Sequence, residues 1–338
     1  MPQQKVTIKD VAQLAKVGKT SVSRYLNGEF HVLSDDIQHK ISDAIKQLNY
    51  QPSQIARSMK GGKTKLIAAV FTDISNPYSI DIMTNIEKSC RDKGYTLLVF
   101  NISNKIEQEE DIIQSLLSYR VDGVIIQSLR LNNPLFSKLP MPIVSIDRPI
   151  DDFHCDIVAL NHVNATQILI NHLLDKDFER ILFITQNIEE SKTRALRAKT
   201  FKEYIESQHS NLGEIIEIDD INNIEKIMDY IALFCRKNTN YKKAIITSNG
   251  ITTLSTLLAL KNMNLISGKD IGLAGFDDTP WLSIVEHGIT VLKQPTDKIG
   301  KKAFDMLFSR INNDMSEYTT ILYEGELIVR GSTLTVEE

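Results

Sequence analysis

The sequence predicts an all-α head followed by an α/β body made of two doubly wound parallel-sheet subdomains. Apolar residues recur at helical spacing near the N-terminus, and from residue 66 onward apolar strand-like runs alternate with helical segments. The charge is uneven as well, because residues 1–65 carry a net charge of +6 and the remaining residues −10. Either this is chance variation along a lysine-rich chain, or the head binds a polyanion such as nucleic acid.

The first helix of the head is expected to begin at about Ile8. Residues 7–10, TIKD, form a variant of the capping box that starts helices. Val11, Leu14 and Ala15 then fall on one face and predict an apolar stripe. Gly18 breaks this pattern, so the helix should end before it.

A second short helix follows, with Val22 and Leu26 directed inward, and a third is expected from Ser34. The opposite face of the second helix is polar and could enter a major groove; it comprises Lys19, Thr20, Ser23, Arg24 and Asn27. Apolar residues of the third helix complete a three-helix core: Ile37, Ile41, Ala44, Ile45 and Leu48. The alternative is a generic three-helix bundle whose polar face is only solvated.

Residues 52–63 are expected to form a hinge helix and linker between a helix-turn-helix head of residues 1–51 and a body of residues 64–338. Ser53 to Met59 make about two helical turns after Pro52, and so short a helix is marginal in water. It should therefore be ordered only when a partner holds it. The run GGKT that follows lacks the upstream glycine and the following helix of a phosphate-binding loop.

The body is expected to contain two sets of alternating strands and helices, which predicts parallel sheets with crossover helices. The first set has strands at Leu66–Phe71, Thr96–Asn101, Gly123–Ile126 and Ile143–Ile146 and helices at Ile80–Lys93 and Glu107–Tyr119. The second set begins near Asp156. It has helices at Val163–Leu174, Lys192–Ser207, Ile224–Cys235 and Ile251–Met263 and strands at Ile181–Ile184, Ala244–Thr247 and Ile271–Phe276.

Ligands of open parallel sheets bind beyond the carboxyl ends of the strands. This rule selects polar residues that can bond to vicinal hydroxyls: Asp73, Asn76, Tyr78, Ser79, Asn101, Gln127, Asp147, Arg148, Gln186, Ser248, Asn249 and Asp277. Tyr78 or Trp281 could stack on a sugar face, although a core position suits Trp281 nearly as well. The alternative is that these loop residues only cap helices and satisfy backbone groups.

Two successive motifs carry a family resemblance. TIKDVAQLAKVGKTSVSRYLNG and AIKQLNYQPSQIARSMK resemble the DNA-binding head and hinge of the LacI/GalR family of bacterial transcription regulators. In the body, DISNPYS, VDGVI, SIDRP, IGLAGFDDTPW and ITVLKQPTDKIGKKAF resemble signatures of the same family, so the resemblance spans nearly the whole chain. The body also resembles periplasmic sugar-binding proteins.

For the DNA-binding part, the resemblance implies that Lys19, Thr20 and Arg24 read bases. It implies that Ser21, Ser23 and Asn27 position the head on phosphates. Thr7 is a further DNA-binding residue that the resemblance implies. In the hinge, Met59 would be levered into a central base step of the minor groove. Its neighbours would assist, with Ala56 small enough for close approach and with Arg57 and Lys60 on phosphates.

For the body, the resemblance implies effector binding and dimerisation. The N-subdomain would comprise about 64–155 and 295–320, and the C-subdomain about 156–294 and 321–338. The implied effector-binding residues are Tyr78, Ser79, Asp147, Thr193, Arg197, Asn249 and Asp277, with Trp281 as a stacking candidate. Arg197 stands out, because a guanidinium in a cleft can grip a carboxylate or a pair of hydroxyls with two hydrogen bonds.

The chain departs from the family pattern at three places. The link between the second and third helices, NGEFHVLSDD, is longer than usual and carries Phe30. Gly250 stands where the family often has Asp, so one potential ligand carboxylate is missing, and Thr200 stands where it often has Gly. The hinge and the Phe30 loop resemble regulators of ketogluconate and related sugar-acid use, which suggests a sugar-acid effector.

These patterns predict a cytoplasmic homodimeric repressor, without metal or cofactor, that leaves a pseudo-palindromic operator when a small molecule binds. GxSxG, HExxH and Walker sequences are absent and the three cysteines lie far apart, so the sequence predicts neither an enzyme nor a metal site. The longest clean apolar run, Leu66–Phe71, is far shorter than the ~20 residues of a membrane helix. The start of the chain does not resemble a signal peptide. Two alternatives stay open: a pleiotropic regulator with a phosphoprotein corepressor, and a sugar-binding receptor without a regulatory role.

Overall fold

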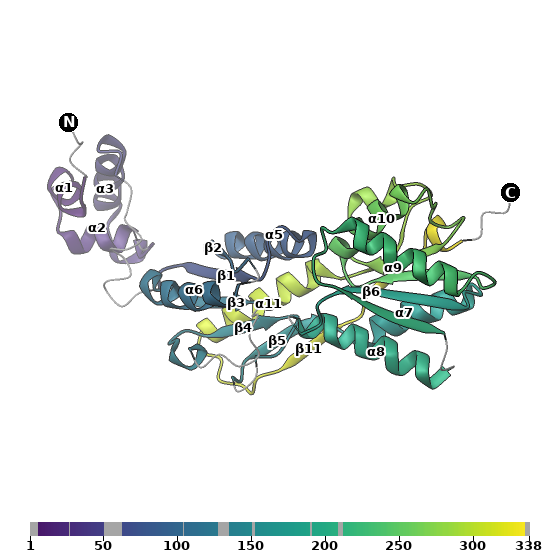
Figure 1. The fold of residues 1–338 in the computed structure, drawn as a ribbon. Coiled ribbons are helices and arrows are strands. Elements are labelled where there is room, and N and C mark those ends of the chain that lie inside the picture. Colours follow the sequence, from purple (N-terminus) through teal and green to yellow (C-terminus); the bar gives the residue numbers. More distant parts are fainter. Residues whose placement is uncertain are drawn as a thin grey trace. The chain divides into compact units, whose positions relative to one another are not determined.

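The structure is a computed structural model that describes residues 6–26, 28–50, 63–103, 105–127, 135–150, 153–189, 191–208 and 212–334. The chain divides into two compact units, Met1–Lys65 and Leu66–Glu338, here called the head and the body (Figure 1). Asn27 lies outside the described residues, and so do the expected hinge positions Ala56, Arg57, Met59 and Lys60.

The head contains three α-helices, α1 (Ile8–Leu14), α2 (Lys19–Leu26) and α3 (Asp35–Gln47), with a short 3₁₀ turn, η1 (Phe30–Val32), before the third. The backbone N–H of Thr7 donates to the Asp10 carboxylate at 2.7 Å, and the Ser34 hydroxyl accepts from the N–H of Ile37 at 3.4 Å. Both contacts satisfy amides at a helix start that have no partner inside the helix. The capping-box start and the Ser34 start are therefore confirmed.

The three helices enclose a small apolar core formed by Val11, Ala12, Ala15, Val22, Ile41 and Ala44. The expected position of Leu14 in this core is wrong, because its side chain is 44% exposed. Ala12 is buried instead, since the inward face of α1 is centred on the side of Val11 away from Leu14. Leu26 and Ile37 are only half-buried at the edge of the core.

The body contains two six-stranded sheets within its described residues. The first comprises β1 (Leu66–Phe71), β2 (Thr96–Asn101), β3 (Gly123–Ile126), β4 (Ile143–Ile146), β5 (Asp156–Leu160) and β11 (Thr320–Tyr323). Their order is β11-β5-β4-β3-β1-β2, and all pairs are parallel. Helices α5 (Pro77–Asp92) and α11 (Thr296–Ile311) cover one face, and α6 (Ile106–Tyr119) covers the other.

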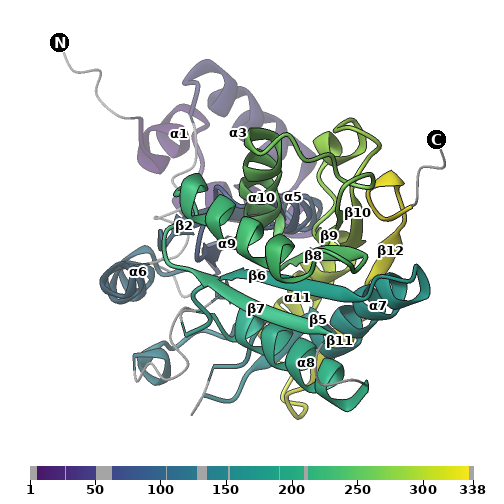
Figure 2. The ribbon, with the colours of Figure 1, turned by 45° about the vertical axis from the view of Figure 1, so that its right-hand side comes forward.

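The second sheet repeats this plan. It comprises β6 (Arg180–Gln186), β7 (Gly213–Ile218), β8 (Lys243–Thr247), β9 (Gly272–Phe276), β10 (Thr290–Lys293) and β12 (Glu326–Ile328), in the order β12-β10-β9-β8-β6-β7. Only the edge strand β12 is antiparallel to its neighbour. Figure 2 shows α8 (Lys192–Gln208) and α9 (Ile224–Lys237) on opposite faces, which they share with α7 (His162–Asp175) and α10 (Gly250–Asn262) respectively. Short 3₁₀ turns complete the body: η2 (Phe136–Lys138), η3 (Pro280–Ser283) and η4 (Gly331–Thr333).

The expected subdomain boundaries need correction. Residues 156–160 were expected to open the second set, but they form β5, which lies between β4 and β11 in the first sheet. Residues 321–323 also belong to that sheet, because β11 pairs with β5 through Tyr323. The chain therefore crosses between the sheets three times, after β5, after β10 and after β11.

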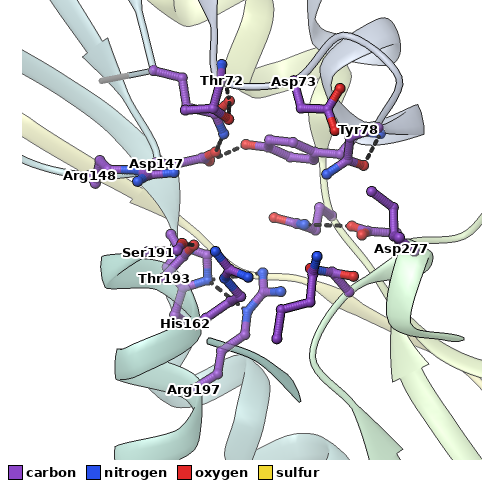
Figure 3. A pocket seen from close by; sticks show the side chains of 17 residues that line it. Thr72, Asp73, Tyr78, Asp147, Arg148, His162, Ser191, Thr193, Arg197 and Asp277 are labelled. Atoms are coloured by element: carbon purple, nitrogen blue, oxygen red, sulfur yellow. Dashed lines mark hydrogen bonds between the residues drawn. The ribbon is translucent and has the colours of Figure 1, made fainter. Parts of the chain in front are cut away.

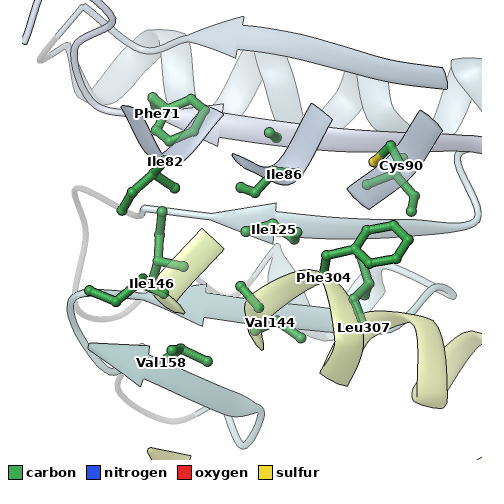
Figure 4. Packing of buried hydrophobic residues seen from close by; sticks show 14 of the residues in the cluster. Phe71, Ile82, Ile86, Cys90, Ile125, Val144, Ile146, Val158, Phe304 and Leu307 are labelled. Atoms are coloured by element: carbon green, nitrogen blue, oxygen red, sulfur yellow. The ribbon is translucent and has the colours of Figure 1, made fainter. Parts of the chain in front are cut away.

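The core of the N-subdomain joins segments that are far apart in the sequence. Ile82 and Ile86 of α5 and Phe304 and Leu307 of α11 pack on the same face of the first sheet (Figure 4). The two helices approach closely at Gly300, where a Cβ atom would lie 2.9 Å from the carbonyl oxygen of Ile82. In the described part of the chain, no helix has the length and hydropathy of a membrane span.

A buried ion pair fixes the return of the chain into β11. Arg310 donates to the Asp156 carboxylate from Nε at 2.7 Å and from Nη2 at 3.1 Å, and the two side chains are 9% and 2% exposed. Asp156 also accepts from the backbone N–H of Thr319 at 2.9 Å. Arg310 further donates to the carbonyl oxygens of residues 314, 316 and 317. One guanidinium thus holds α11, β5 and the segment before β11 together.

We expect Asp156→Ala to lower the free energy of unfolding by about 3 kcal/mol, because it leaves the Arg310 guanidinium buried without its counter-ion. Urea denaturation followed by far-ultraviolet circular dichroism measures this loss. The matched control is Asp36→Ala, which removes the exposed pair with Lys40 (2.6 Å) and should cost less than about 1 kcal/mol. Equal effects of the two substitutions would contradict a structural role for the buried pair.

Candidate functional site

A polar cavity of about 140 Å³ lies between the carboxyl ends of the two sheets of the body (Figure 3). Its lining is drawn from both subdomains: Thr72, Asp73, Asn76, Tyr78, Gln127, Asp147, Arg148, His162, Gln186, Ser191, Thr193, Arg194, Arg197, Asn249, Ile251, Asp277 and Gln294. The location is the one expected for a ligand of open parallel sheets. The cavity volume is below the ~300–1,000 Å³ of pockets for drug-sized ligands, so a molecule bound here must be small.

One wall of the cavity is organised around Asp147, which follows β4. Its backbone has φ of 69°, in the left-handed region, and this turns the carboxylate toward the cavity. The Tyr78 hydroxyl donates to Oδ1, and the Gln127 side-chain amide donates to Oδ2 at 2.6 Å. Thr72 in turn donates to Gln127 Oε1 at 2.8 Å. Burial raises the pKa of Asp147, and hydrogen bonds from Tyr78 and Gln127 oppose that rise.

The opposite wall repeats this arrangement around Asp277, which follows β9. The two strands, β4 and β9, hold the same place in their sheets, and Asp277 also has a positive φ, of 73°. Its Oδ2 accepts from the backbone N–H of Gly250 at 2.9 Å, and its Oδ1 accepts from the Gln294 side-chain amide at 2.6 Å. Both carboxylates therefore have each oxygen engaged by a donor of the protein.

A histidine and an arginine form the floor of the cavity. Arg197 of α8 stacks on the Phe276 ring at 3.7 Å and donates to the carbonyl oxygen of Ser248 at 2.5 Å. Its Nε and Nη2 lie 3.3 and 3.2 Å from Nδ1 of His162, at the start of α7. Burial lowers the pKa of His162 well below 6.5, and the positive charges of Arg197 and Arg148 act in the same direction. His162 is therefore neutral, and its proton resides on Nε2 because Nδ1 accepts from Arg197.

Among the described residues, the buried polar atoms of this lining that lack a hydrogen-bond partner are mostly donors. They are Nε and Nη1 of Arg148, Nε2 of His162 and Oε1 of Gln294. Arg148 and His162 are 4% and 5% exposed. A buried donor without a partner costs free energy, so these atoms identify groups that a bound molecule would satisfy.

The structure brings most of the expected effector residues into this lining: Tyr78, Asp147, Thr193, Arg197, Asn249 and Asp277. Ser79 and Trp281 lie elsewhere. Ser79 is 2% exposed inside the first turn of α5, and Trp281 packs on the core beneath α9 and α10, so it is not placed to stack on a ligand. Asn101 accepts from the backbone N–H of Ile74, and Ser248 contributes its carbonyl oxygen to Arg197.

Sequence reasoning missed six lining residues: Thr72, His162, Ser191, Arg194, Ile251 and Gln294. His162 lies two residues after β5, and Gln294 directly follows β10. The sequence analysis predicts neither strand, so these two positions are not among the residues expected at the carboxyl ends of strands. A prediction of strands at β5 and β10 would place both His162 and Gln294 among the expected lining residues.

The DNA-binding candidates of the head that the structure describes lie on or beside α2. Lys19, Thr20 and Arg24 are exposed, whereas Ser21 and Ser23 are half-buried. The Thr7 hydroxyl donates to Asp10 at 2.8 Å. The exposed residues of α2 form the polar face that the helical spacing predicts, opposite the buried Val22.

Comparisons with known proteins agree with this architecture. The model of the lacI family of bacterial regulatory proteins matches residues 7–53, and the model of the periplasmic binding protein-like domain matches residues 170–333. The HTH-type transcriptional regulator PtxS of Pseudomonas aeruginosa is 35% identical over 333 residues, which cover 97% of this chain and 96% of PtxS. The chain belongs to the LacI family. It is accordingly a DNA-binding transcription regulator, and the body of this LacI-family protein is its effector-binding domain.

Solved structures share the fold. The lac repressor dimer bound to operator and the anti-inducer ONPF has a TM-score of 0.84 at 22% identity and covers 98% of this chain and 100% of its own. A periplasmic binding protein/LacI transcriptional regulator of Alkaliphilus metalliredigens in complex with D-xylulofuranose has a TM-score of 0.70 at 24% identity. The match covers 80% of this chain and 99% of that one.

The neutral His162 makes stability depend on pH. Below about pH 6.5 the unfolded chain takes up a proton at this residue, whereas the folded chain does not, so acidification favours unfolding. Between about pH 7.5 and 5.5, we expect the free energy of unfolding to fall less in His162→Asn than in the wild type. Below about pH 6.5, the slopes of the two free energies with pH should differ by up to about 1.4 kcal/mol per pH unit. Urea denaturation across this range measures it, and parallel losses in the two proteins would contradict a neutral His162.

Proposed function

We propose that this LacI-family protein is a homodimeric repressor that binds a pseudo-palindromic operator and whose cavity takes a small sugar acid. The observation that supports a sugar acid is that the buried polar atoms without a hydrogen-bond partner in the cavity lining are mostly donors. Arg148 and His162 offer three buried N–H donors, against one free acceptor on Gln294, within the described lining. The two oxygens of a carboxylate can accept from all three donors, and its negative charge also balances the buried charge of Arg148.

The remaining lining suits the hydroxyl groups of such a ligand. Asn249 donates to Gln186 Oε1 at 3.0 Å, and the Ser191 and Thr193 hydroxyls lie 2.8 Å apart, so short polar side chains surround the donors. At Gly250 this chain lacks the aspartate that the family often carries next to Asn249. The missing carboxylate would have repelled an acidic ligand. A protein of the same fold forms a complex with D-xylulofuranose, which supports a sugar-sized effector.

Regulation follows if the effector favours one arrangement of the subdomains. The ligand contacts residues of both, so its affinity changes when they rotate about the three chain crossings. A coupling free energy of ~1–3 kcal/mol is typical and would suffice to release the operator. In this proposal the hinge residues Ala56, Arg57, Met59 and Lys60 transmit that change to the DNA contacts of Lys19, Thr20 and Arg24.

Further properties belong to the same proposal: cytoplasmic location, no catalytic activity and association of two chains through their bodies. Exposed apolar side chains support association, because Leu254 and Leu258 of α10 are 46% and 43% exposed and Ile284 is 81% exposed. The runner-up function, a pleiotropic regulator with a phosphoprotein corepressor, would not need the buried donors of Arg148 and His162.

We expect a sugar acid such as 2-ketogluconate or gluconate to raise the melting temperature of the purified protein, and the matching neutral sugar to raise it less. Arg148→Gln should weaken binding of the acid by at least about tenfold, because it removes the buried cation that pairs with the carboxylate. The control is Arg91→Gln, which changes an exposed arginine 3.3 Å from Glu87 and should leave binding unchanged. Equal affinity of Arg148→Gln and the wild type would exclude the carboxylate contact.

We expect Arg24→Ala to weaken binding to the operator far more than binding to nonspecific DNA, because a base contact adds ~1–3 kcal/mol of discrimination whereas a phosphate contact adds none. Binding of the full-length protein to both duplexes at about 150 mM salt measures this ratio. An equal loss on both duplexes would show that Arg24 contacts only phosphates.

A further inference from the structure

The link between α2 and α3 places a carboxylate beside the arginine of the recognition helix. Glu29 follows the helix, and its backbone N–H donates to the carbonyl oxygen of Arg24 at 3.0 Å. The Glu29 carboxylate lies 4.0 Å from Arg24 Nε, and the two side chains are 46% and 49% exposed. At this distance the two groups form an exposed ion pair rather than a hydrogen bond, next to the polar face of α2.

The structure anchors this link at both of its ends. The Phe30 ring packs edge-on against Tyr25 of α2, with a centroid distance of 5.3 Å. The Gln38 side-chain amide of α3 donates to the carbonyl oxygens of Phe30 at 3.2 Å and Leu33 at 3.0 Å. The longer link is thus fixed to α2 and α3, and the backbone of Glu29 is held at a defined position relative to Arg24.

We propose that Glu29 is a positioning residue that orients the Arg24 guanidinium for base reading. A carboxylate at Nε leaves the two terminal nitrogens free, and these form the fork that matches O6 and N7 of guanine. Because the pair exists before DNA binds, less side-chain freedom is lost when Arg24 meets a base. The same carboxylate repels phosphates and so weakens contacts that do not depend on sequence. The inference rests on the proposed role of Arg24 in base reading.

The expected effect lies in discrimination rather than in total affinity. Exposed ion pairs contribute little, so loss of the carboxylate should reduce the preference for the favoured base about two- to fivefold. Binding to all duplexes should rise slightly at the same time, because a negative charge is removed from the DNA-binding head. A residue needed only for folding would lower the melting temperature and affinity together, without a change in base preference.

The test compares full-length wild type, Glu29→Gln, Arg24→Ala and the double variant on a library of duplexes with a randomised central segment. Asp43→Asn is the matched control, because it removes an exposed acid of α3 that is remote in sequence from Arg24. Enriched sequences give the base preference at each position, and thermal melting of each variant reports folding. We expect Glu29→Gln to lose preference at the base pair where Arg24→Ala loses it, and the double variant to match Arg24→Ala there.

Three results would overturn the inference. They are an unchanged base preference in Glu29→Gln, a loss at a base pair that Arg24→Ala leaves intact, and an equal change in Asp43→Asn. If the wild type enriches no shared sequence, the proposed sequence-specific binding fails, and the role of Glu29 fails with it. If the wild type enriches a sequence but Arg24→Ala reads it normally, only the roles of Arg24 and Glu29 fail.

Discussion

Both sheets of the body end their parallel strands at one polar cavity, and this constraint orders the rest of the structure. Strands β4 and β9 occupy the same place in the two sheets, and each delivers an aspartate in the left-handed conformation to opposite walls. The helices that follow the strands begin at the same edge, so Tyr78, His162 and Asn249 enter the cavity from helix starts or their caps. The apolar faces of those helices then cover the sheets.

The charged side chains of the cavity are buried, and the hydrogen bonds among them determine which groups can still bond to a ligand. Asp147 and Asp277 are fully engaged by amides and a phenol, so their charges are already solvated by the protein. Arg197 is held by Phe276, His162 and Ser248, and it serves as a support for the imidazole as much as a contact for a ligand. Arg148 lacks such partners at Nε and Nη1 among the described residues. In the proposed function, ligand specificity comes from the donors that the protein leaves unsatisfied rather than from the full set of polar residues in the lining.

Apolar periodicity predicts most helices and strands of this fold, and the carboxyl ends of the predicted strands indicate most of the cavity lining. Both predictions fail where a strand lacks a clear apolar run. Short strands that are wholly or mostly apolar, such as Leu66–Phe71 and Ile143–Ile146, are visible in the sequence because both of their faces are buried. Strand β7 is an edge strand with half-buried residues and shows no such run. Strand β5 has an apolar run of the same kind, but its place in the first sheet depends on its pairing with β4 and β11, which the sequence does not show. The contact between Tyr78 and Asp147 also needs tertiary structure, since 69 residues separate them.

The three crossings between the sheets set the order in which the protein can form during synthesis. The head needs only its own residues and can fold soon after it leaves the ribosome. The N-subdomain cannot, because α11 and β11 complete its core and its edge, and both follow the whole of the C-subdomain in the chain. At typical synthesis rates of ~5–20 residues per second, the gap between β5 and α11 corresponds to roughly seven to thirty seconds. During that time the face of the first sheet that α11 covers is exposed, so the nascent chain presents a folded DNA-binding head before its regulatory domain exists.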